Sequence, residues 1–178
     1  MKAGTETVFS FFMNNFTFQD YMTAVQAVIL FLGLGLTVWT LRSQKKDAKN
    51  LATLNLIIHQ RNDSKFNDAS NLLTELIKNK NTYSDLSSYL NDSKSKEAEA
   101  ILTVLNFREF VSVGINNGII DEKTYKNAFC SVFVRDWNNL ENTIKALRKS
   151  NNNKNTLFQD FEVLAKKWIK QPLKVKVK

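Results

Sequence analysis

The chain of 178 residues contains one cysteine, one histidine, one proline and five glycines. A single cysteine, Cys130, excludes an internal disulfide and suits a reducing compartment. With His59 as the one histidine, a zinc site or a Cys–His catalytic pair would depend on single residues, so we expect no metal and no cofactor. Neither a GxxxxGKS/T loop nor a GxGxxG motif is present, which excludes the usual phosphate-binding loops.

The most informative feature that is present is an uncharged, mainly apolar run from Tyr21 to Leu41. At about 1.5 Å per residue, a helix of this length reaches roughly 30 Å, the thickness of the hydrocarbon core of a bilayer. Tyr21 and Trp39 suit the two membrane interfaces. A cleaved signal peptide would need a shorter run and a cleavage site between small residues, whereas this run ends at Leu41-Arg42. The sequence predicts a transmembrane helix over residues 21–41.

Charges on either side of this run indicate its orientation. Residues 1–20 contain Lys2 against Glu6 and Asp20, whereas the next segment, a predicted basic juxtamembrane linker over residues 42–50, holds four cations. Cationic flanks stay in the cytoplasm, so residues 1–20 should form a short extracytoplasmic N-terminus and the rest of the chain should be cytoplasmic. The four cations are Arg42, Lys45, Lys46 and Lys49.

The rest of the chain carries apolar residues at spacings of three and four, which is typical of helices. We expect an all-α fold, with one N-terminal transmembrane helix followed by a cytoplasmic bundle of about five to six helices over residues 51–169. The expected helices cover about 47–59, 66–78, 86–90, 93–116, 121–149 and 157–169, with a turn at 82–85. Caps are predicted at Asn62 or Asp63 and at Ser93, and Gly118 should close the long helix. The acidic pair Asp121-Glu122 should open the next helix.

In each predicted helix, the apolar residues at helical spacing are expected to face the core. In the first helix of the bundle these are Leu51, Leu54 and Ile58, and in the long helix they include Phe110 and Val113.

One polar constellation interrupts the long helix: Asn106, Arg108 and Glu109. Asn106 and Glu109 are three residues apart and share a face with apolar neighbours, so at least one of them should be partly buried. A buried carboxylate needs a cationic or hydrogen-bonding partner, which Arg61, Arg135 or Arg148 could supply. Two interpretations stay open, a structural pair that fixes helix register and a site for a small polar ligand or for acid–base chemistry.

The cytoplasmic part is basic. It holds 24 of the 25 Lys and Arg residues and 15 of the 17 Asp and Glu residues, a net charge of +9. Anionic lipid headgroups are therefore the expected partner, and the basic tail over residues 170–178 should contact the bilayer surface. Nucleic acid is disfavoured because the C-terminal lysines come with no arginine and with one aromatic residue. These lysines are Lys166, Lys167, Lys170, Lys174, Lys176 and Lys178.

Several short segments resemble the bacterial family called domain of unknown function 4760. They lie at residues 52–63, 105–121 and 161–168 and at Asp136-Trp137, and the resemblance covers roughly residues 51–169. Residues 105–121 form its most distinctive part. The resemblance implies a bacterial protein with an N-terminal membrane segment, and it supplies no activity.

Together these features predict a single-pass protein of the bacterial inner membrane whose cytoplasmic helical domain works by binding. It would act as a scaffold or as an accessory or anti-phage defence effector, with an unidentified protein partner. Gly33 and Thr37 have a spacing that allows helix pairing, so a homo-oligomer is also expected. The alternative is a membrane-tethered enzyme that uses carboxylates such as Glu109 and Glu162.

Overall fold

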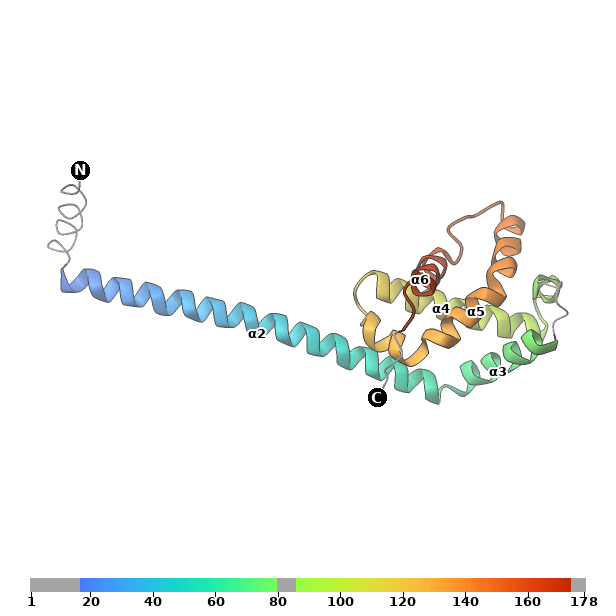
Figure 1. The fold of residues 1–178 in the computed structure, drawn as a ribbon, viewed down its shortest axis with the longest axis horizontal. Helices are drawn as coiled ribbons and strands as arrows, with labels where there is room; N and C mark the ends of the chain where they lie inside the picture. Colours follow the sequence, from blue (N-terminus) through green and yellow to red (C-terminus); the bar gives the residue numbers. More distant parts are fainter. Residues whose placement is uncertain (1–16, 80–85, 174–178) are drawn as a thin grey trace. The chain divides into compact units, whose positions relative to one another are not determined.

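The structure is a computed structural model that describes residues 17–79 and 86–173. Those residues form five α-helices and one short 3-10 helix, and they contain no β-strand (Figure 1). The predicted all-α fold, a helical bundle after an apolar N-terminal helix, is confirmed. In chain order the elements are α2 (Phe18–Asn62), α3 (Ser64–Asn79), η1 (Leu86–Asn91), α4 (Lys96–Asn116), α5 (Glu122–Ser150) and α6 (Gln159–Lys170).

The chain divides into two compact units, residues 1–47 and residues 48–178. In the first unit, α2 is long and apolar enough to cross a membrane, and none of its apolar window is buried. The hydroxyls of Thr23, Thr37 and Thr40 donate to carbonyl oxygens four residues earlier, at 2.9, 2.8 and 2.8 Å. These bonds satisfy the hydroxyls within the helix, which lowers the cost of placing them among lipid tails.

Helix α2 continues through the basic segment that we expected to be a linker. Residues 42–50 are helical, and no new helix begins near Asp47. The reason is composition, because residues 36–62 contain neither glycine nor proline and are rich in residues that favour helices. After α2 ends at Asn62, Asp63 caps α3 by accepting a hydrogen bond from the backbone N–H of Phe66 at 3.1 Å. Asp63 is one of the two caps predicted there.

The part of α2 within the second unit buries a different face from the one we expected. Thr53, Ile57 and Gln60 are buried. The predicted core residues are instead exposed, with exposed fractions of 60% for Leu51, 47% for Leu54 and 56% for Ile58. Polar contacts select the buried face, because Thr53 Oγ1 accepts the backbone N–H of Asp121 at 2.8 Å and Gln60 accepts the hydroxyl proton of Tyr125. An alternative rotation of α2 would remove the acceptors of the Asp121 N–H and of the buried Tyr125 hydroxyl.

Helices α3 to α6 enclose one apolar core. Helix α3 packs against α4, α6 packs against both α4 and α5, and η1 contacts α4 and α5. Aromatic rings fill the region between α5 and α6, where Phe133 lies 4.9 Å from Phe161, edge to face, and 4.6 Å from Trp168. Burial of such large apolar rings contributes to the stability of the bundle, together with the aliphatic residues of the core.

The predicted boundary between α4 and α5 is confirmed. Helix α4 ends at Asn116, and Gly118 adopts the left-handed conformation with φ of +71°. The backbone N–H groups of Ile119 and Ile120 then donate to the Gly114 carbonyl at 2.8 and 3.0 Å. Asp121 caps α5 by accepting the N–H of Thr124 at 2.8 Å.

The start of α4 differs from the prediction. Its cap is Ser95, whose Oγ accepts the N–H of Ala98 at 3.1 Å, and not Ser93. Asp92 causes the shift, because its side chain and its carbonyl accept the backbone N–H groups of Lys94 and Ser95, which holds these residues in a turn. The turn predicted at residues 82–85 lies outside the described residues.

One strip of α4 faces solvent, which corrects the prediction that Phe110 and Val113 lie in the core. The strip consists of Asn106, Phe110, Val113 and Asn117, which recur at spacings of four and three. Phe110 is 62% exposed and Val113 is 37% exposed. Contacts with α3, α6 and η1 occupy the other faces of α4 and leave this strip uncovered.

Candidate functional site

An ion pair between α4 and α5 lies fully inside the bundle. Nε and Nη2 of Arg108 donate to Oδ2 of Asp136 at 3.0 and 2.8 Å, and both side chains are almost completely buried. Nε and Nη2 of Arg135 donate to the other oxygen, Oδ1, at 3.2 and 2.9 Å. The Asp136 carboxylate therefore accepts four hydrogen bonds, which offset the cost of removing its charge from water.

The sequence pattern indicated Arg108 as a candidate polar residue but did not indicate Asp136 as its partner. Asp136 lies at a core spacing on α5, three residues after Phe133 and four before Leu140. An acidic residue at such a position was the available signal, because a buried carboxylate requires a cation. Arg135, which the sequence suggested as a partner for Glu109, binds Asp136 instead.

Aromatic side chains enclose the Arg108 guanidinium. Its central carbon lies 5.7 Å from the ring centre of Phe66 and 5.5 Å from that of Phe133, within the range of cation–π contacts. Arg108 Nη1 is buried and has no hydrogen-bond partner in the described residues. The guanidinium is thus held by one carboxylate and two rings, a rigid arrangement that stabilises one packing of α4 against α5.

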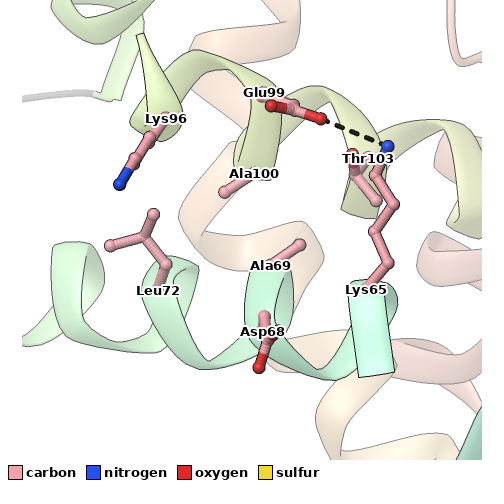
Figure 2. A pocket seen from close by; sticks show the side chains of 8 residues that line it. All are labelled: Lys65, Asp68, Ala69, Leu72, Lys96, Glu99, Ala100 and Thr103. Carbon is pink, nitrogen blue, oxygen red and sulfur yellow. Dashed lines mark ion pairs between the residues drawn. The ribbon is translucent and has the colours of Figure 1, made fainter. Parts of the chain in front are cut away.

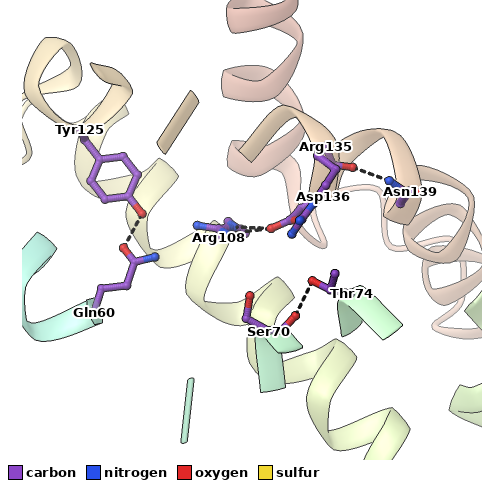
Figure 3. A network of polar contacts seen from close by, with 8 residues as sticks. All are labelled: Gln60, Ser70, Thr74, Arg108, Tyr125, Arg135, Asp136 and Asn139. Carbon is purple, nitrogen blue, oxygen red and sulfur yellow. Dashed lines mark hydrogen bonds and ion pairs between the residues drawn. The ribbon is translucent and has the colours of Figure 1, made fainter. Parts of the chain in front are cut away.

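Tyr125 and Gln60 extend this polar cluster towards α2, as Figure 3 shows. The Tyr125 hydroxyl donates to Gln60 Oε1 at 2.8 Å. Burial raises the pKa of Tyr125 to about 12, although the nearby positive charge of Arg108 opposes the rise. Tyr125 therefore stays neutral at physiological pH and acts as a hydrogen-bond donor that fixes the end of α2 on the bundle.

Glu109 supplies the missing cap of α6. Phe158, which precedes this helix, has a φ of +54° and makes no side-chain capping bond. The Glu109 oxygens instead accept the backbone N–H groups of Phe161 at 2.8 Å and Asp160 at 3.3 Å. Burial raises the pKa of Glu109 above its ordinary value, and the two N–H groups counteract part of that rise. A carboxylate in this position also interacts favourably with the positive end of the helix dipole.

The three residues of the predicted polar site do not form one site. Arg108 points into the core, Glu109 is half-buried against α6, and Asn106 lies on the exposed strip of α4. The expectation that either Asn106 or Glu109 would be partly buried is met by Glu109. Its partners are backbone N–H groups, and the suggested Arg148 contributes only a nearby positive charge.

A cavity of about 220 Å³ lies between α3 and α4 (Figure 2). Cations and carboxylates alternate around it, and Lys65 pairs with Glu99 at 3.2 Å. The two lysines and two acids balance each other, so the cavity has no preference for a ligand of either charge. Its lining consists of Lys65, Asp68, Ala69, Leu72, Lys96, Glu99, Ala100 and Thr103.

The predicted membrane-surface residues fall into three groups. Arg42, Lys45, Lys46 and Lys49 lie on α2. Lys166 and Lys167 form ion pairs with Glu162 and Glu122, respectively, whereas Lys170, the last residue of α6, is exposed. Lys174, Lys176 and Lys178 lie outside the described residues.

The two residues with potential metal or nucleophile chemistry are Cys130 and His59, which lie on different helices. Cys130 is buried in the core, and His59 is exposed in the last turn of α2. Within residues 17–79 and 86–173, no three His, Cys, Asp or Glu side chains are grouped so that they could hold a metal ion.

Comparison with known proteins identifies the family. The family described as "Domain of unknown function (DUF4760)" matches residues 27–168, which include most of the apolar part of α2 and nearly the whole bundle. No curated protein and no solved structure matches the chain. Because the match spans well over half of the sequence, the chain belongs to the DUF4760 family.

Proposed function

We propose that this protein is a single-pass protein of the bacterial inner membrane whose helical bundle lies in the cytoplasm and works by binding. The observation that carries the proposal is the apolar part of α2. No part of its apolar window is buried within the protein, and the hydroxyls along it are satisfied within the helix. An apolar surface of this length is costly in water and favourable in lipid.

The orientation follows from the cations on α2 after Leu41. Arg42, Lys45 and Lys46 are exposed, and no carboxylate in residues 17–79 and 86–173 forms an ion pair with them. Such a cluster is retained on the cytoplasmic side during insertion and is attracted by the anionic lipids of that leaflet.

Binding is favoured over catalysis by the state of the two candidate carboxylates. Glu109 is occupied by the backbone of α6, and Glu162 pairs with Arg148 at 2.7 Å and with Lys166. These contacts, the Lys166 hydrogen bond above all, lower the pKa of Glu162. A general acid needs a raised pKa and access to substrate, and a base must be free to take a proton. The enzyme alternative would require both carboxylates to leave their present partners.

Self-association is part of the proposal. Leu51, Leu54 and Ile58 form an exposed apolar stripe on α2 with spacings of three and four residues. Copies inserted in one membrane in the same orientation would present this stripe in parallel, where it could pair as in a coiled coil. A Leu54→Cys variant in a Cys130→Ala background should form a disulfide-linked dimer when isolated membranes that contain it are treated with a thiol oxidant. Persistence of the monomer would contradict this part of the proposal.

The role in anti-phage defence stays a prediction.

The experiment that tests the membrane proposal uses two reporters fused after Lys178. Green fluorescent protein fluoresces when it folds in the cytoplasm, and alkaline phosphatase is active only outside it. We expect the fluorescent fusion to be bright and to stay in the membrane after alkaline carbonate extraction, and the phosphatase fusion to be inactive. A variant with Arg42, Lys45, Lys46 and Lys49 changed to Gln should lower the ratio of fluorescence to phosphatase activity. An active phosphatase in the parent protein would contradict the orientation.

A further inference from the structure

Two cavities meet at Leu173, just after α6. One is an apolar groove of about 370 Å³ between α5 and α6. The other is a basic cavity of about 410 Å³ at the start of α5, to which α2 contributes Lys49. Leu173 lines both, and its side chain is 42% exposed. An elongated ligand could therefore occupy the groove and the cavity at the same time.

The groove is suited to hydrocarbon. Most of its lining is apolar, and Ser131 and Asn138 are its polar members. The apolar members are Cys130, Val134, Trp168, Ile169, Pro172 and Leu173. Ile169 and Leu173 remain partly exposed next to it. Covering such a surface with an acyl chain contributes about 0.8 kcal/mol per buried methylene group.

The basic cavity is suited to an anion. Lys49, Lys123 and Lys126 line it together with Asp121 and Glu122. Both carboxylates are engaged, because Asp121 caps α5 and Glu122 binds Lys167 at 2.7 Å and the indole N–H of Trp168 at 3.0 Å. With Lys167 balancing Glu122, the three lining lysines exceed the remaining acid by two positive charges.

Lys126 links the two cavities. Its Nζ donates to the carbonyl oxygen of Gln171 and lies 5.8 Å from the ring centre of Trp168. These contacts hold the segment after α6 against α5 and place a cation where the apolar groove begins. A headgroup phosphate in the basic cavity would then lie beside an acyl chain in the groove.

We propose that the groove and the basic cavity together bind one anionic phospholipid. The choice of a lipid is favoured by the position of Lys49 in the sequence, because it follows Leu41, the end of the apolar run, by only eight residues. This inference rests on the proposed membrane function and adds to it a defined binding site and a ligand class. The general attraction between basic residues and an anionic surface would not require the groove.

The test uses native mass spectrometry of the full-length protein purified in detergent, with phosphatidylglycerol or phosphatidylcholine added at equal concentrations. We expect the complex of the protein with one phosphatidylglycerol to be at least fivefold more abundant than its complex with one phosphatidylcholine. Changing Lys49, Lys123 and Lys126 to Gln should lower this retention at least fivefold. A control variant changes three exposed lysines outside both cavities to Gln and should retain the lipid within twofold of the parent. These lysines are Lys78, Lys94 and Lys149.

Two further arms separate the lipid from its headgroup. Ile169→Asn alters only the apolar groove, because Ile169 does not line the basic cavity, so it should also reduce retention of phosphatidylglycerol severalfold. Glycerol 3-phosphate, which has the phosphate without acyl chains, should fail to displace the lipid at tenfold excess. Equal retention by the triple lysine variant and the parent would overturn the site, and efficient displacement by glycerol 3-phosphate would overturn its assignment to a lipid.

The outcome is separable from that of the reporter fusions. Selective retention of phosphatidylglycerol together with an active phosphatase fusion would refute only the orientation. A cytoplasmic reporter together with no selective retention would refute only the lipid site.

Discussion

Removal of Asp136 should destabilise the bundle severely. An Asp136→Ala variant leaves the Arg108 guanidinium buried, 1% exposed, with no carboxylate to accept its hydrogen bonds. Stranding one member of a buried pair costs about 3–5 kcal/mol, a large part of the roughly 5–15 kcal/mol that holds a typical domain folded. For a domain of about this size, the melting temperature should fall by roughly 10–20 °C.

Tryptophan fluorescence provides a suitable assay, because Trp137 and Trp168 are buried in the core of the bundle. Trp39 lies exposed on the apolar part of α2, so a Trp39→Phe background confines the signal to the bundle. Thermal unfolding of the full-length protein in detergent should then report the melting temperature of the bundle directly.

Two further variants test whether the unpaired Arg108 charge causes the loss of stability. Removing both charges with Arg108→Met and Asp136→Leu should recover most of the loss, because no buried charge remains unpaired. Arg135→Gln should cost about 1 kcal/mol or less, since the Arg135 side chain is 39% exposed. If Asp136→Ala melted within 2 °C of the parent, the buried pair would not have the structural role that we assign to it.

Two further predictions concern α4. Because the pKa of Glu109 is raised in the folded state, its contribution to stability is fully present below its unfolded value of about 4.5 and is lost as the pH rises through the folded pKa. The parent should therefore lose melting temperature relative to Glu109→Gln as the pH rises from 4.5 to 7, and parallel curves would contradict this. A Cβ added at Gly114 would overlap Cδ1 of Ile120 and lie 2.9 Å from its Cγ1, so Gly114→Ala should cost about 1–3 kcal/mol. Urea unfolding should detect this loss, and it should be smaller when Ile120→Ala is added.

The sequence predicted those features that local residues determine. Gly118 closes α4 and Asp121 opens α5 as predicted, because a glycine at positive φ and an acidic cap act within one turn. Local pattern also located the apolar run of α2, and the absence of glycine and proline after it explains why the helix continues.

Features that depend on tertiary contacts could not be predicted in this way. Apolar spacing favoured Leu51, Leu54 and Ile58 as the buried face of α2, but Thr53 and Gln60 are buried because their partners lie on distant segments. Contacts with distant segments also explain why Arg108 and Glu109 of the predicted polar site do not form one site. Asp136 is 28 positions from Arg108, and the α6 backbone that occupies Glu109 is more than 50 positions away.

The most direct test of the membrane topology is cysteine labelling in intact bacterial cells. In a Cys130→Ala background, one variant carries Lys154→Cys in the exposed loop between α5 and α6, and another carries Asn15→Cys before α2. A membrane-impermeant maleimide should label the cysteine at position 15 in intact cells and the cysteine at position 154 only after the cells are permeabilised. Labelling at position 154 in intact cells, with none at position 15, would contradict the account.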